Sequence, residues 1–398
     1  MTDLLAIGST FLLIIVLLRL RWNFGAVMLT AAAVLGGLYL IGPVRQLTVM
    51  ARAAADPVTL NLIGGLVLIM VVENIIRKRG LLKQMTDSLS AVARDRRVTM
   101  AVLPGVIGIL PSAGGAAFSA PLVQEAAGGA DISPERRAFI NYWFRHIWEY
   151  IAPLYPGIVL VAAVTHIPLN TVLLTQLPLP LAVVAAGMLF GFRGVRNAPV
   201  PGQRSMKDVR DLTVSLLPII ASLVLVVVVK MPLAPAMASV VAALFIVYRY
   251  PLREIGIAFR ESISLKVILM VAGIMVFKGM LDASGAIESL PRFFRESGMP
   301  PAVVFCALPF IVGLLTGLTV GFVGATFPLI TAMAGGHPDP SVITFAFASG
   351  FAGVMLSPTH LCFVLTVRYF NADLAGTYRL LYLPTLLVFL VGLGVYLV

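Results

Sequence analysis

The most polar stretch inside an apolar run of this sequence is Asn141–Tyr150, which reads Asn-Tyr-Trp-Phe-Arg-His-Ile-Trp-Glu-Tyr. Arg145 and Glu149 are four residues apart, so on a regular helix they would lie on one face and pair. One hypothesis is that this pair only neutralises itself. The other is that Arg145 binds an anion while His146 or Glu149 takes up a proton, because imidazole titrates near neutral pH. A single histidine is also commonly a hydrogen-bonded structural residue, and the sequence leaves these alternatives open.

Four interruptions of apolar runs provide further candidates. They are Pro111–Gly115, Ala152–Gly157, Thr316–Gly321 and Ser357–His360. Proline, glycine and hydroxyl-bearing residues break a helix there, where an unbroken helix would otherwise be expected. The substrate-binding residues that we expect are Ser112, Ala113, Gly114, Gly115, Asn141, Arg145, Pro153, Tyr155, Thr316, Gly317, Thr319, Ser357 and Thr359, and the expected coupling residues are His146, Glu149 and His360.

The break at Ser357–His360 is typical of a helix start, because Ser357 can cap a helix and Pro358 can occupy its first position. A helix that starts inside a membrane presents free N–H groups and about half a positive charge, which favour an anion. The alternative is that glycines near the breaks only allow helices to pack closely. We prefer that explanation for Gly108 and Gly313.

The composition predicts a multi-pass membrane protein. The chain has 398 residues, of which 59% are hydrophobic and 12% charged, and its mean hydropathy is +0.99. Soluble domains contain about 25% charged residues. The net charge of +11 is explained by basic cytoplasmic loops rather than by nucleic-acid binding. The two cysteines, Cys306 and Cys362, form no spacing typical of a metal site or a disulfide framework. We therefore expect no metal, no cofactor and no enzymatic activity.

Ten apolar segments approach the length of a membrane span, which is roughly 20 residues. The segments are 4–20, 24–42, 58–77, 138–165, 171–192, 211–229, 232–249, 263–283, 341–368 and 376–397. Two further apolar regions, 99–128 and 302–335, are each broken in the middle. Such broken regions predict re-entrant hairpins, whose irregular tips must be covered by protein or face a water-filled cavity. One long kinked helix is the alternative for 99–128.

The second half of the sequence repeats the first with a constant shift of 205 residues. Gly108 corresponds to Gly313 and Pro153 to Pro358, since 313 − 108 and 358 − 153 both equal 205. Each half has five crossing segments, and this odd number gives the halves opposite orientations. We expect an all-α polytopic membrane protein with about ten transmembrane helices, two re-entrant hairpins and two inverted-topology repeats, the architecture of secondary transporters. The expected parts are a first repeat over 1–195, a cytoplasmic linker over 196–210 and a second repeat over 211–398.

Basic residues predict the orientation, because cytoplasmic loops are enriched in Lys and Arg. If both termini lie outside, most Lys and Arg side chains fall in cytoplasmic loops. The outside loops then hold only Arg45, Arg52, Lys230, Arg292 and Arg295. This distribution requires that 99–128 does not cross, which favours the re-entrant hairpin. The sequence thus predicts a multi-pass protein of the cell membrane (inner or plasma membrane) with both termini outside.

At these residues the chain resembles the ion transporter superfamily of secondary carriers, which includes dicarboxylate, citrate and gluconate permeases. Within it, Pro111–Gly115 and Asn141–Tyr150 are similar to DUF401, a family of predicted ten-span membrane proteins. The resemblance covers nearly the whole chain. It implies two inverted repeats, two re-entrant hairpins, two broken helices and a homodimer with elevator-like movement.

The leading hypothesis is a secondary active transporter of a small, carboxylate-like organic anion, coupled as a symporter to H+ or Na+. Its partners would be that anion, the coupling ion, the lipid bilayer and a second copy of the chain, without nucleic acid. An alternative is a membrane protein that binds or translocates an anionic lipid headgroup. A membrane enzyme is the third reading, and it would need a metal or nucleophile cluster at the midplane.

Overall fold

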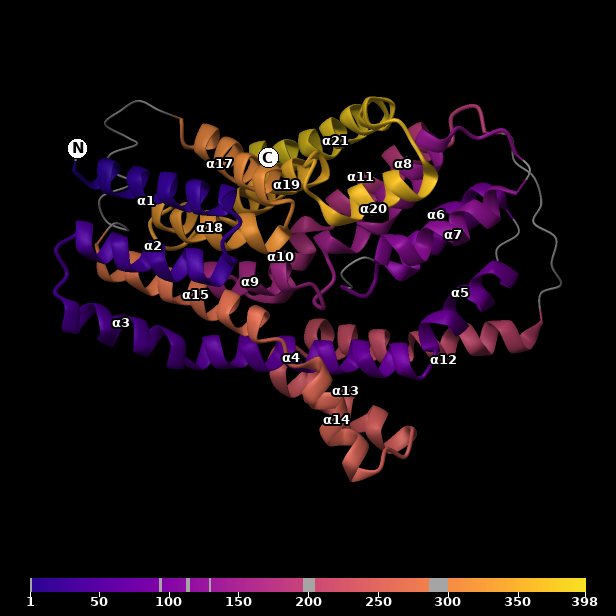
Figure 1. Ribbon diagram of the computed structural model, residues 1–398, viewed down its shortest axis with the longest axis horizontal. Helices are drawn as coiled ribbons and strands as arrows, with labels where there is room; N and C mark the ends of the chain where they lie inside the picture. The colour runs from indigo at the N-terminus through magenta and orange to yellow at the C-terminus, as the bar shows by residue number, and fades with distance from the viewer. Residues whose placement is uncertain (1, 93–94, 112–114, 129, 196–204, 286–299) are drawn as a thin grey trace.

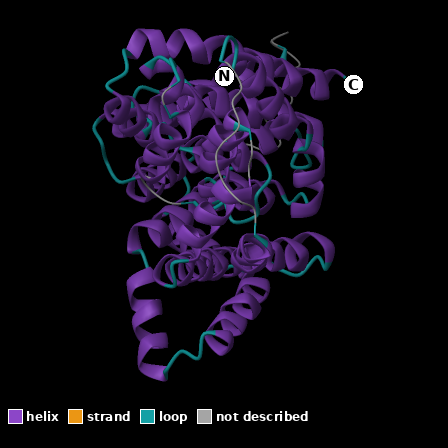
Figure 2. Ribbon diagram, turned by 90° about the vertical axis from the view of Figure 1, so that its right-hand side faces the viewer, coloured by secondary structure: helices purple, strands orange, loops and turns teal. Residues whose placement is uncertain are grey.

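The computed structural model describes residues 2–92, 95–111, 115–128, 130–195, 205–285 and 300–398. Over these residues the chain folds into helices joined by loops, without a strand in the described ranges (Figures 1 and 2). The first half contains α1 (Thr2–Arg19), α2 (Phe24–Leu38), α3 (Pro43–Ala55), α4 (Pro57–Lys78), α5 (Leu81–Val92), α6 (Arg96–Ile107), α7 (Gly115–Ala127), α8 (Pro134–Arg145), the 3-10 helix η1 (Ile147–Tyr150), α9 (Pro156–Thr165), α10 (Leu169–Gln176), α11 (Pro178–Ala186) and the π-helical turn η2 (Gly187–Gly191).

The second half contains a similar series of helices. They are α12 (Met206–Leu223), the π-helical turn η3 (Val224–Val228), α13 (Leu233–Val247), α14 (Leu252–Ser262), α15 (Leu265–Ala283), α17 (Pro301–Thr316), α18 (Thr319–Met333), α19 (Pro340–Met355), α20 (Leu361–Phe370) and α21 (Leu374–Leu397). The helices α13 and α14 project from the lower side of the molecule in Figure 1. The expected linker over 196–210 lies mostly outside the described residues.

Four helical segments of the described chain are long and apolar enough to cross a membrane. They are α4, Leu169–Gly191, Met206–Val228 and α21, and the pair α14 and α15 would add a fifth with a bend of 56°. Several further apolar helices have only 10–17 residues. The expected segments 138–165 and 341–368 are each divided, the first into α8, η1 and α9 and the second into α19 and α20. The prediction of ten spans therefore holds only in its coarser form, a helical protein with several helices able to cross a membrane.

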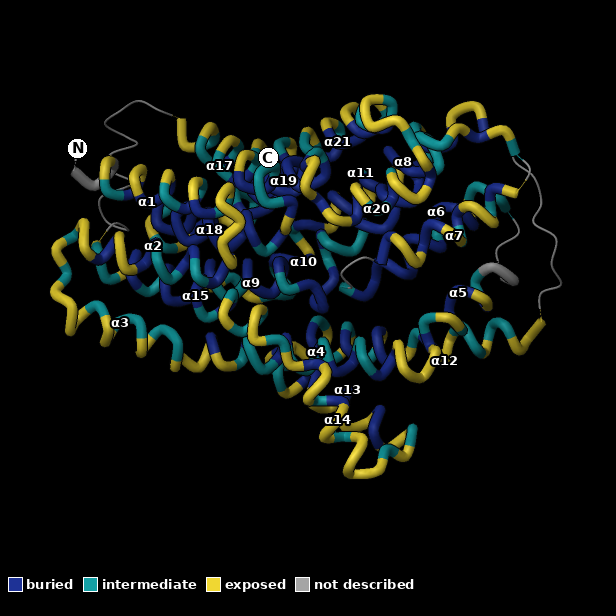
Figure 3. The backbone as a smooth tube through the Cα atoms, viewed as in Figure 1, coloured by how far each residue is buried: buried dark blue, intermediate teal, exposed yellow. Residues whose placement is uncertain are grey.

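Two largely exposed helices, α3 and α14, were not predicted from the sequence. α3 has no buried residue and is largely exposed in Figure 3, while α14 buries only Ala258 and Ser262. α3 packs along α15, and α14 packs against α4. Apolar and charged residues share each of these helices, as in helices that lie along a membrane surface. A search for long apolar runs overlooks such helices because charged residues interrupt every run.

Side-chain caps fix where several of the helices begin. Asp56, Asp95, Ser133, Asp339 and Asp373 each accept a hydrogen bond from a backbone N–H in the first turn of α4, α6, α8, α19 and α21. Each such cap stabilises its helix by about 1 kcal/mol. These caps satisfy backbone donors that would otherwise lack a partner at the helix end.

Two glycines bring helices into close contact, as the sequence analysis preferred. A Cβ atom on Gly108 would lie 2.0 Å from the carbonyl oxygen of Arg145, and one on Gly313 would lie 2.1 Å from that of Gly350. Both pairs of residues are 205 apart, since 313 − 108 and 350 − 145 give the same number. Only glycine therefore allows α6 to approach α8 and α17 to approach α19.

The helix α18 forms the centre of the molecule. Every residue of α18 except Val320 is buried (Figure 3). It packs against α9 and α17, whereas α7 packs against α20. The interruption between α17 and α18 therefore lies next to the interruptions that precede α9 and α20.

Candidate functional site

Three helices begin at one cavity of about 230 Å³ between α8, α9, α18 and α20. The first residues of α9, α18 and α20 contribute Pro156, Thr319 and Leu361 to its wall. The complete lining is Pro111, Arg145, Glu149, Tyr155, Pro156, Gly157, Gly317, Leu318, Thr319, Val320, His360, Leu361 and Cys362. Residues from both halves of the chain therefore form this cavity.

At the three helix starts that border the cavity, the N-cap side chain makes no capping hydrogen bond, as is also the case for α3, α10, α11, α13, α14, α15 and α17. The N-cap residues are Tyr155 for α9, Leu318 for α18 and His360 for α20. The first turn of a helix carries backbone N–H groups without an intrahelical acceptor and a partial positive charge. Three such starts around one cavity favour a negatively charged group inside it.

Gly317 allows the interruption at Thr316–Gly321 to contact the interruption at Ser357–His360. It ends α17 in the left-handed region, with φ of +61°, which glycine adopts at little cost. A Cβ atom at this position would lie 2.9 Å from the backbone N and Cα of His360 and 3.0 Å from Oγ of Ser357. A side chain is therefore excluded both by the backbone angle and by the neighbouring loop.

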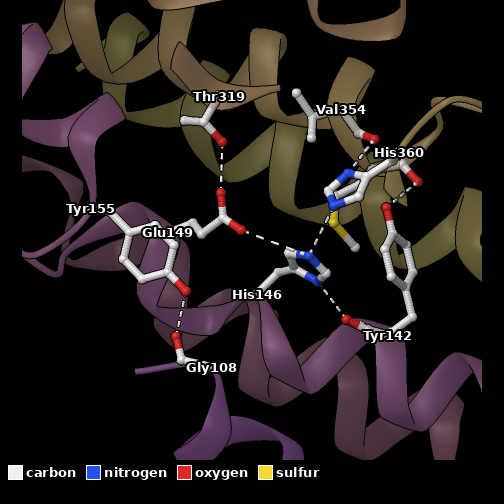
Figure 4. Close-up of polar contacts among 9 residues, drawn as sticks. Gly108, Tyr142, His146, Glu149, Tyr155, Thr319, Val354 and His360 are labelled. Carbon is white, nitrogen blue, oxygen red and sulfur yellow. Dashed lines mark hydrogen bonds and ion pairs between the residues drawn. The ribbon is translucent and has the colours of Figure 1, made fainter. Parts of the chain in front are cut away.

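A hydrogen bond crosses the cavity between the two halves of the chain. The hydroxyl of Thr319 donates to Oε2 of Glu149 at 2.6 Å (Figure 4). The other carboxylate oxygen, Oε1, lies 3.7 Å from Nε2 of His146. Glu149 belongs to η1 and Thr319 to the first turn of α18, so this carboxylate connects the broken segment of the first half to α18.

Two buried histidines face each other behind the carboxylate. Nε2 of His146 lies 3.2 Å from Nε2 of His360 (Figure 4). Nδ1 of His146 is 2.5 Å from the carbonyl oxygen of Tyr142, and Nδ1 of His360 is 3.3 Å from that of Val354. A carbonyl oxygen can only accept, so each contact is a hydrogen bond in the tautomer that carries its proton on Nδ1. In two neutral imidazoles, both Nε2 atoms are then acceptors.

Two tyrosine hydroxyls hold the walls of the site in place. Tyr142 is fully buried and donates to the carbonyl oxygen of Met355 at 3.1 Å. Tyr155 donates to the carbonyl oxygen of Gly108 (Figure 4). The first bond connects α8 to the end of α19, and the second connects the N-cap of α9 to the end of α6.

Arg145 is the last residue of α8, and its side chain is 3% exposed. It lines the cavity and lies beside the thiol of Cys362. The sequence analysis considered an i, i+4 pair with Glu149 on one continuous helix. That geometry was wrong, because α8 ends at Arg145 and residues 147–150 form a 3-10 helix.

Six of the expected site residues line the cavity. They are Arg145, Glu149, Tyr155, Gly317, Thr319 and His360. The expected residues Ser112, Ala113 and Gly114 lie outside the described residues. The expected residues that are described but do not line the cavity are Gly115, Asn141, His146, Pro153, Thr316, Ser357 and Thr359.

Several of the residues outside the lining have structural partners. Asn141 donates through Nδ2 to the carbonyl oxygen of Ala116 at 3.1 Å and to Oγ1 of Thr366 at 3.0 Å, which joins α8 to α7 and α20. Thr316 turns back and donates to the carbonyl oxygen of Val312 at 2.7 Å.

The expected helix start at Ser357 was wrong by several residues. Oγ of Ser357 lies 2.9 Å from Oγ1 of Thr359 and accepts from the backbone N–H of Thr359 at 3.3 Å. These bonds close a turn, and α20 begins only at Leu361, with His360 as its N-cap. His360 is thereby placed at a helix start that faces the cavity.

Cys362 is a lining residue that sequence reasoning missed. One nitrogen of His146, one of His360 and Sγ of Cys362 lie within 4.8 Å of one another. The expectation of no metal-binding pattern was based on spacing along the sequence, and His146 lies more than 200 residues from the other two. The only local signal was the short spacing His360-Leu361-Cys362.

A larger cavity of about 470 Å³ lies away from this site, between the end of α3, the start of α4 and the second half of α15. Its charged residues compensate one another, as Nζ of Lys278 lies 3.0 Å from Oδ2 of Asp282. The helix start that borders it, that of α4, is already capped by Asp56. The smaller cavity is therefore the better candidate for a functional site.

Comparison with known proteins gives a family but no activity. None of the curated proteins matches the chain significantly. The family described as "Protein of unknown function (DUF401)" matches residues 4–398, which is nearly the whole chain. The chain therefore belongs to the DUF401 family.

Proposed function

We propose that this protein is a secondary active transporter of a small organic anion. The observation that carries the proposal is the cavity at which three helices begin without a side-chain cap, beside the buried guanidinium of Arg145. Helix starts and an arginine are the groups that bind a carboxylate in a site shielded from water. The volume of about 230 Å³ favours a ligand with few heavy atoms.

The order of the helices supports an internal repeat. α9 (Pro156–Thr165) and α20 (Leu361–Phe370) have the same length and are shifted by 205 residues, since 361 − 156 and 370 − 165 give that number. In a two-fold repeat, a contact between two helices recurs as a contact between their counterparts in the other half. α4 packs against α13 while α15 packs against α2, and α7 packs against α20 while α18 packs against α9.

In the proposed topology the two repeats, 1–195 and 211–398, have opposite orientations in the membrane. The pairs α6–α7 and α17–α18 are the re-entrant hairpins, and α8–α9 and α19–α20 are the broken helices. Both termini then lie outside, and the repeats together supply about ten crossings. This is the arrangement of secondary transporters, in which broken helices meet near the midplane. By the resemblance to the ion transporter superfamily, we propose a homodimer with elevator-type movement.

The proposed coupling ion is H+ or Na+. Glu149 supports this, because its carboxylate borders the cavity and is bonded to the second hairpin through Thr319. An ionisable residue inside a membrane protein is costly and usually functional. Uptake into liposomes that carry a proton gradient or a sodium gradient distinguishes the two ions.

A second candidate is binding or translocation of an anionic lipid headgroup. Leu318 and Leu361 line the cavity and are both 51% exposed. Exposed leucines at the edge of an anion site suit an acyl chain next to a headgroup. A thermal-shift screen that includes both small carboxylates and short-chain anionic lipids separates the two candidates.

The decisive experiment uses Arg145→Ala in purified full-length protein. We expect loss of the thermal stabilisation by organic anions and loss of uptake into liposomes. The matched control is Arg379→Ala, an exposed arginine on α21, which should retain both. If Arg145→Ala combined with Glu149→Ala recovers uptake, Arg145 only neutralises Glu149 and the proposed role in anion binding is refuted.

The orientation is tested separately with Ser205→Cys in sealed cells. Ser205 is exposed at the start of α12, in the loop that the proposal places in the cytoplasm. An impermeant thiol reagent added outside should therefore not label it. Labelling from the outside would overturn the proposed topology.

A further inference from the structure

We propose that His146, His360 and Cys362 form a binding site for a divalent transition-metal ion of the zinc class, next to the cavity. One nitrogen of each imidazole and Sγ of Cys362 lie within 4.8 Å of one another. Two imidazoles and one thiolate are a donor set that zinc uses in proteins. This proposal concerns metal binding alone and does not depend on the proposed transport activity.

The orientation of the two histidines is the first argument. Both Nδ1 atoms point to backbone carbonyl oxygens, those of Tyr142 and Val354. A carbonyl partner on the second nitrogen is the usual way in which proteins orient a metal-binding imidazole. It leaves both Nε2 atoms without a proton, 3.2 Å apart (Figure 4). In this tautomer the two acceptors repel each other at such a distance unless a cation binds to both.

The distances are the second argument. Two nitrogens bound tetrahedrally to zinc at about 2.05 Å are about 3.3 Å apart. The separation between the Nε2 atoms of His146 and His360 is 3.2 Å, so these two ligands need little movement. Sγ of Cys362 lies within 4.8 Å of a nitrogen of each imidazole, so Cys362 is positioned to supply a third ligand.

The number of donor groups is the third argument, and it favours a metal ion over a shared proton. A proton would need only the two imidazoles, whereas a thiol and a carboxylate also converge here. Oε1 of Glu149 lies 3.7 Å from Nε2 of His146, and the thiol of Cys362 lies beside Arg145. His360, Cys362 and Glu149 also line the cavity, so a fourth position of the ion faces it.

The test is titration of the purified full-length protein, with any affinity tag removed, with Co²⁺ as a spectroscopic probe for zinc. We expect one equivalent to bind and to give a thiolate-to-cobalt absorption band that Zn²⁺ abolishes. The band should be lost in Cys362→Ser and reduced at least tenfold in apparent affinity in His360→Ala. The matched control is Cys306→Ser, since Cys306 is partly buried on α17 and is not part of the cluster.

A second measurement remains decisive if Cys362→Ser or His360→Ala fails to fold. In the wild-type chain, Zn²⁺ should slow the alkylation of Cys362 at least tenfold and leave that of Cys306 unchanged, as read by mass spectrometry of the two peptides. The proposal is overturned if no stoichiometric metal binds, if Cys362→Ser keeps the thiolate band, or if Zn²⁺ protects both cysteines equally. Absence of metal binding would leave a shared proton as the cation between the histidines, without bearing on anion binding.

Discussion

Replacing Thr319 with valine tests the hydrogen bond that crosses the cavity. Valine has nearly the shape of threonine, so the change removes the hydroxyl that donates to Glu149 at 2.6 Å and leaves the packing intact. Thr319 is 7% exposed and the Glu149 side chain 13%, so water replaces the lost bond poorly. Hydrogen bonds to charged groups contribute about 1.5–3 kcal/mol. The free energy of unfolding should fall by that amount.

The assay is a double-mutant cycle with Thr319→Val and Glu149→Met, measured by reversible unfolding in mixed detergent micelles. We expect a coupling energy of about 1.5 kcal/mol or more between the two positions. Thr319→Ser keeps the hydroxyl and is the control, which should restore most of the stability. If the two changes add to within about 0.5 kcal/mol, the residues are energetically independent and the link between the halves has no energetic role.

Two further changes test the packing that surrounds the site. Gly313→Ala places a Cβ atom 2.1 Å from the carbonyl oxygen of Gly350, so it should destabilise the protein by about 3 kcal/mol or more in the same unfolding assay, whereas Gly37→Ala, which meets no atom within 4 Å, should be neutral or stabilising. Equal effects of the two changes would contradict the close-contact explanation. Tyr142→Phe removes the hydroxyl bonded to Met355 and should cost about 1 kcal/mol, and an unchanged stability would show that this bond contributes nothing.

The interruptions of the helices could be predicted from the sequence because proline and glycine act locally. The break before α9 at Pro156 and the break at Gly317 were both visible as residue types that end or start helices. The exact start of α20 was not, because it depends on competition between two local options. Ser357 can cap a helix or close a turn with Thr359, and in the structure it closes the turn.

Other features of the site could not be predicted because they depend on contacts between distant segments. His146 and His360 are 214 residues apart, and only the packed fold shows that their rings face each other. The same holds for the bond between Glu149 and Thr319. Short amphipathic helices such as α3 were missed for another reason, since their apolar residues do not form a continuous run.

The absence of caps at the centre leads to a last prediction, at Leu318. This N-cap residue of α18 has the extended backbone of a normal cap, with φ of −134° and ψ of 127°, but its side chain cannot accept a hydrogen bond. Leu318→Asp supplies a carboxylate that caps α18 and places a negative charge at the cavity. It should raise the stability by about 1 kcal/mol, as N-cap substitutions do, while weakening the binding of organic anions in the thermal-shift assay.

Leu318→Asn separates the two effects, because asparagine caps a helix as well as aspartate does but adds no charge. We expect Leu318→Asn to gain the same stability and to lose less anion binding than Leu318→Asp. The comparison isolates electrostatic competition, since the two side chains have nearly the same size. If both variants are stabilised and bind anions as the wild type does, the start of α18 does not contact the ligand. The binding site would then have to be sought away from the three helix starts.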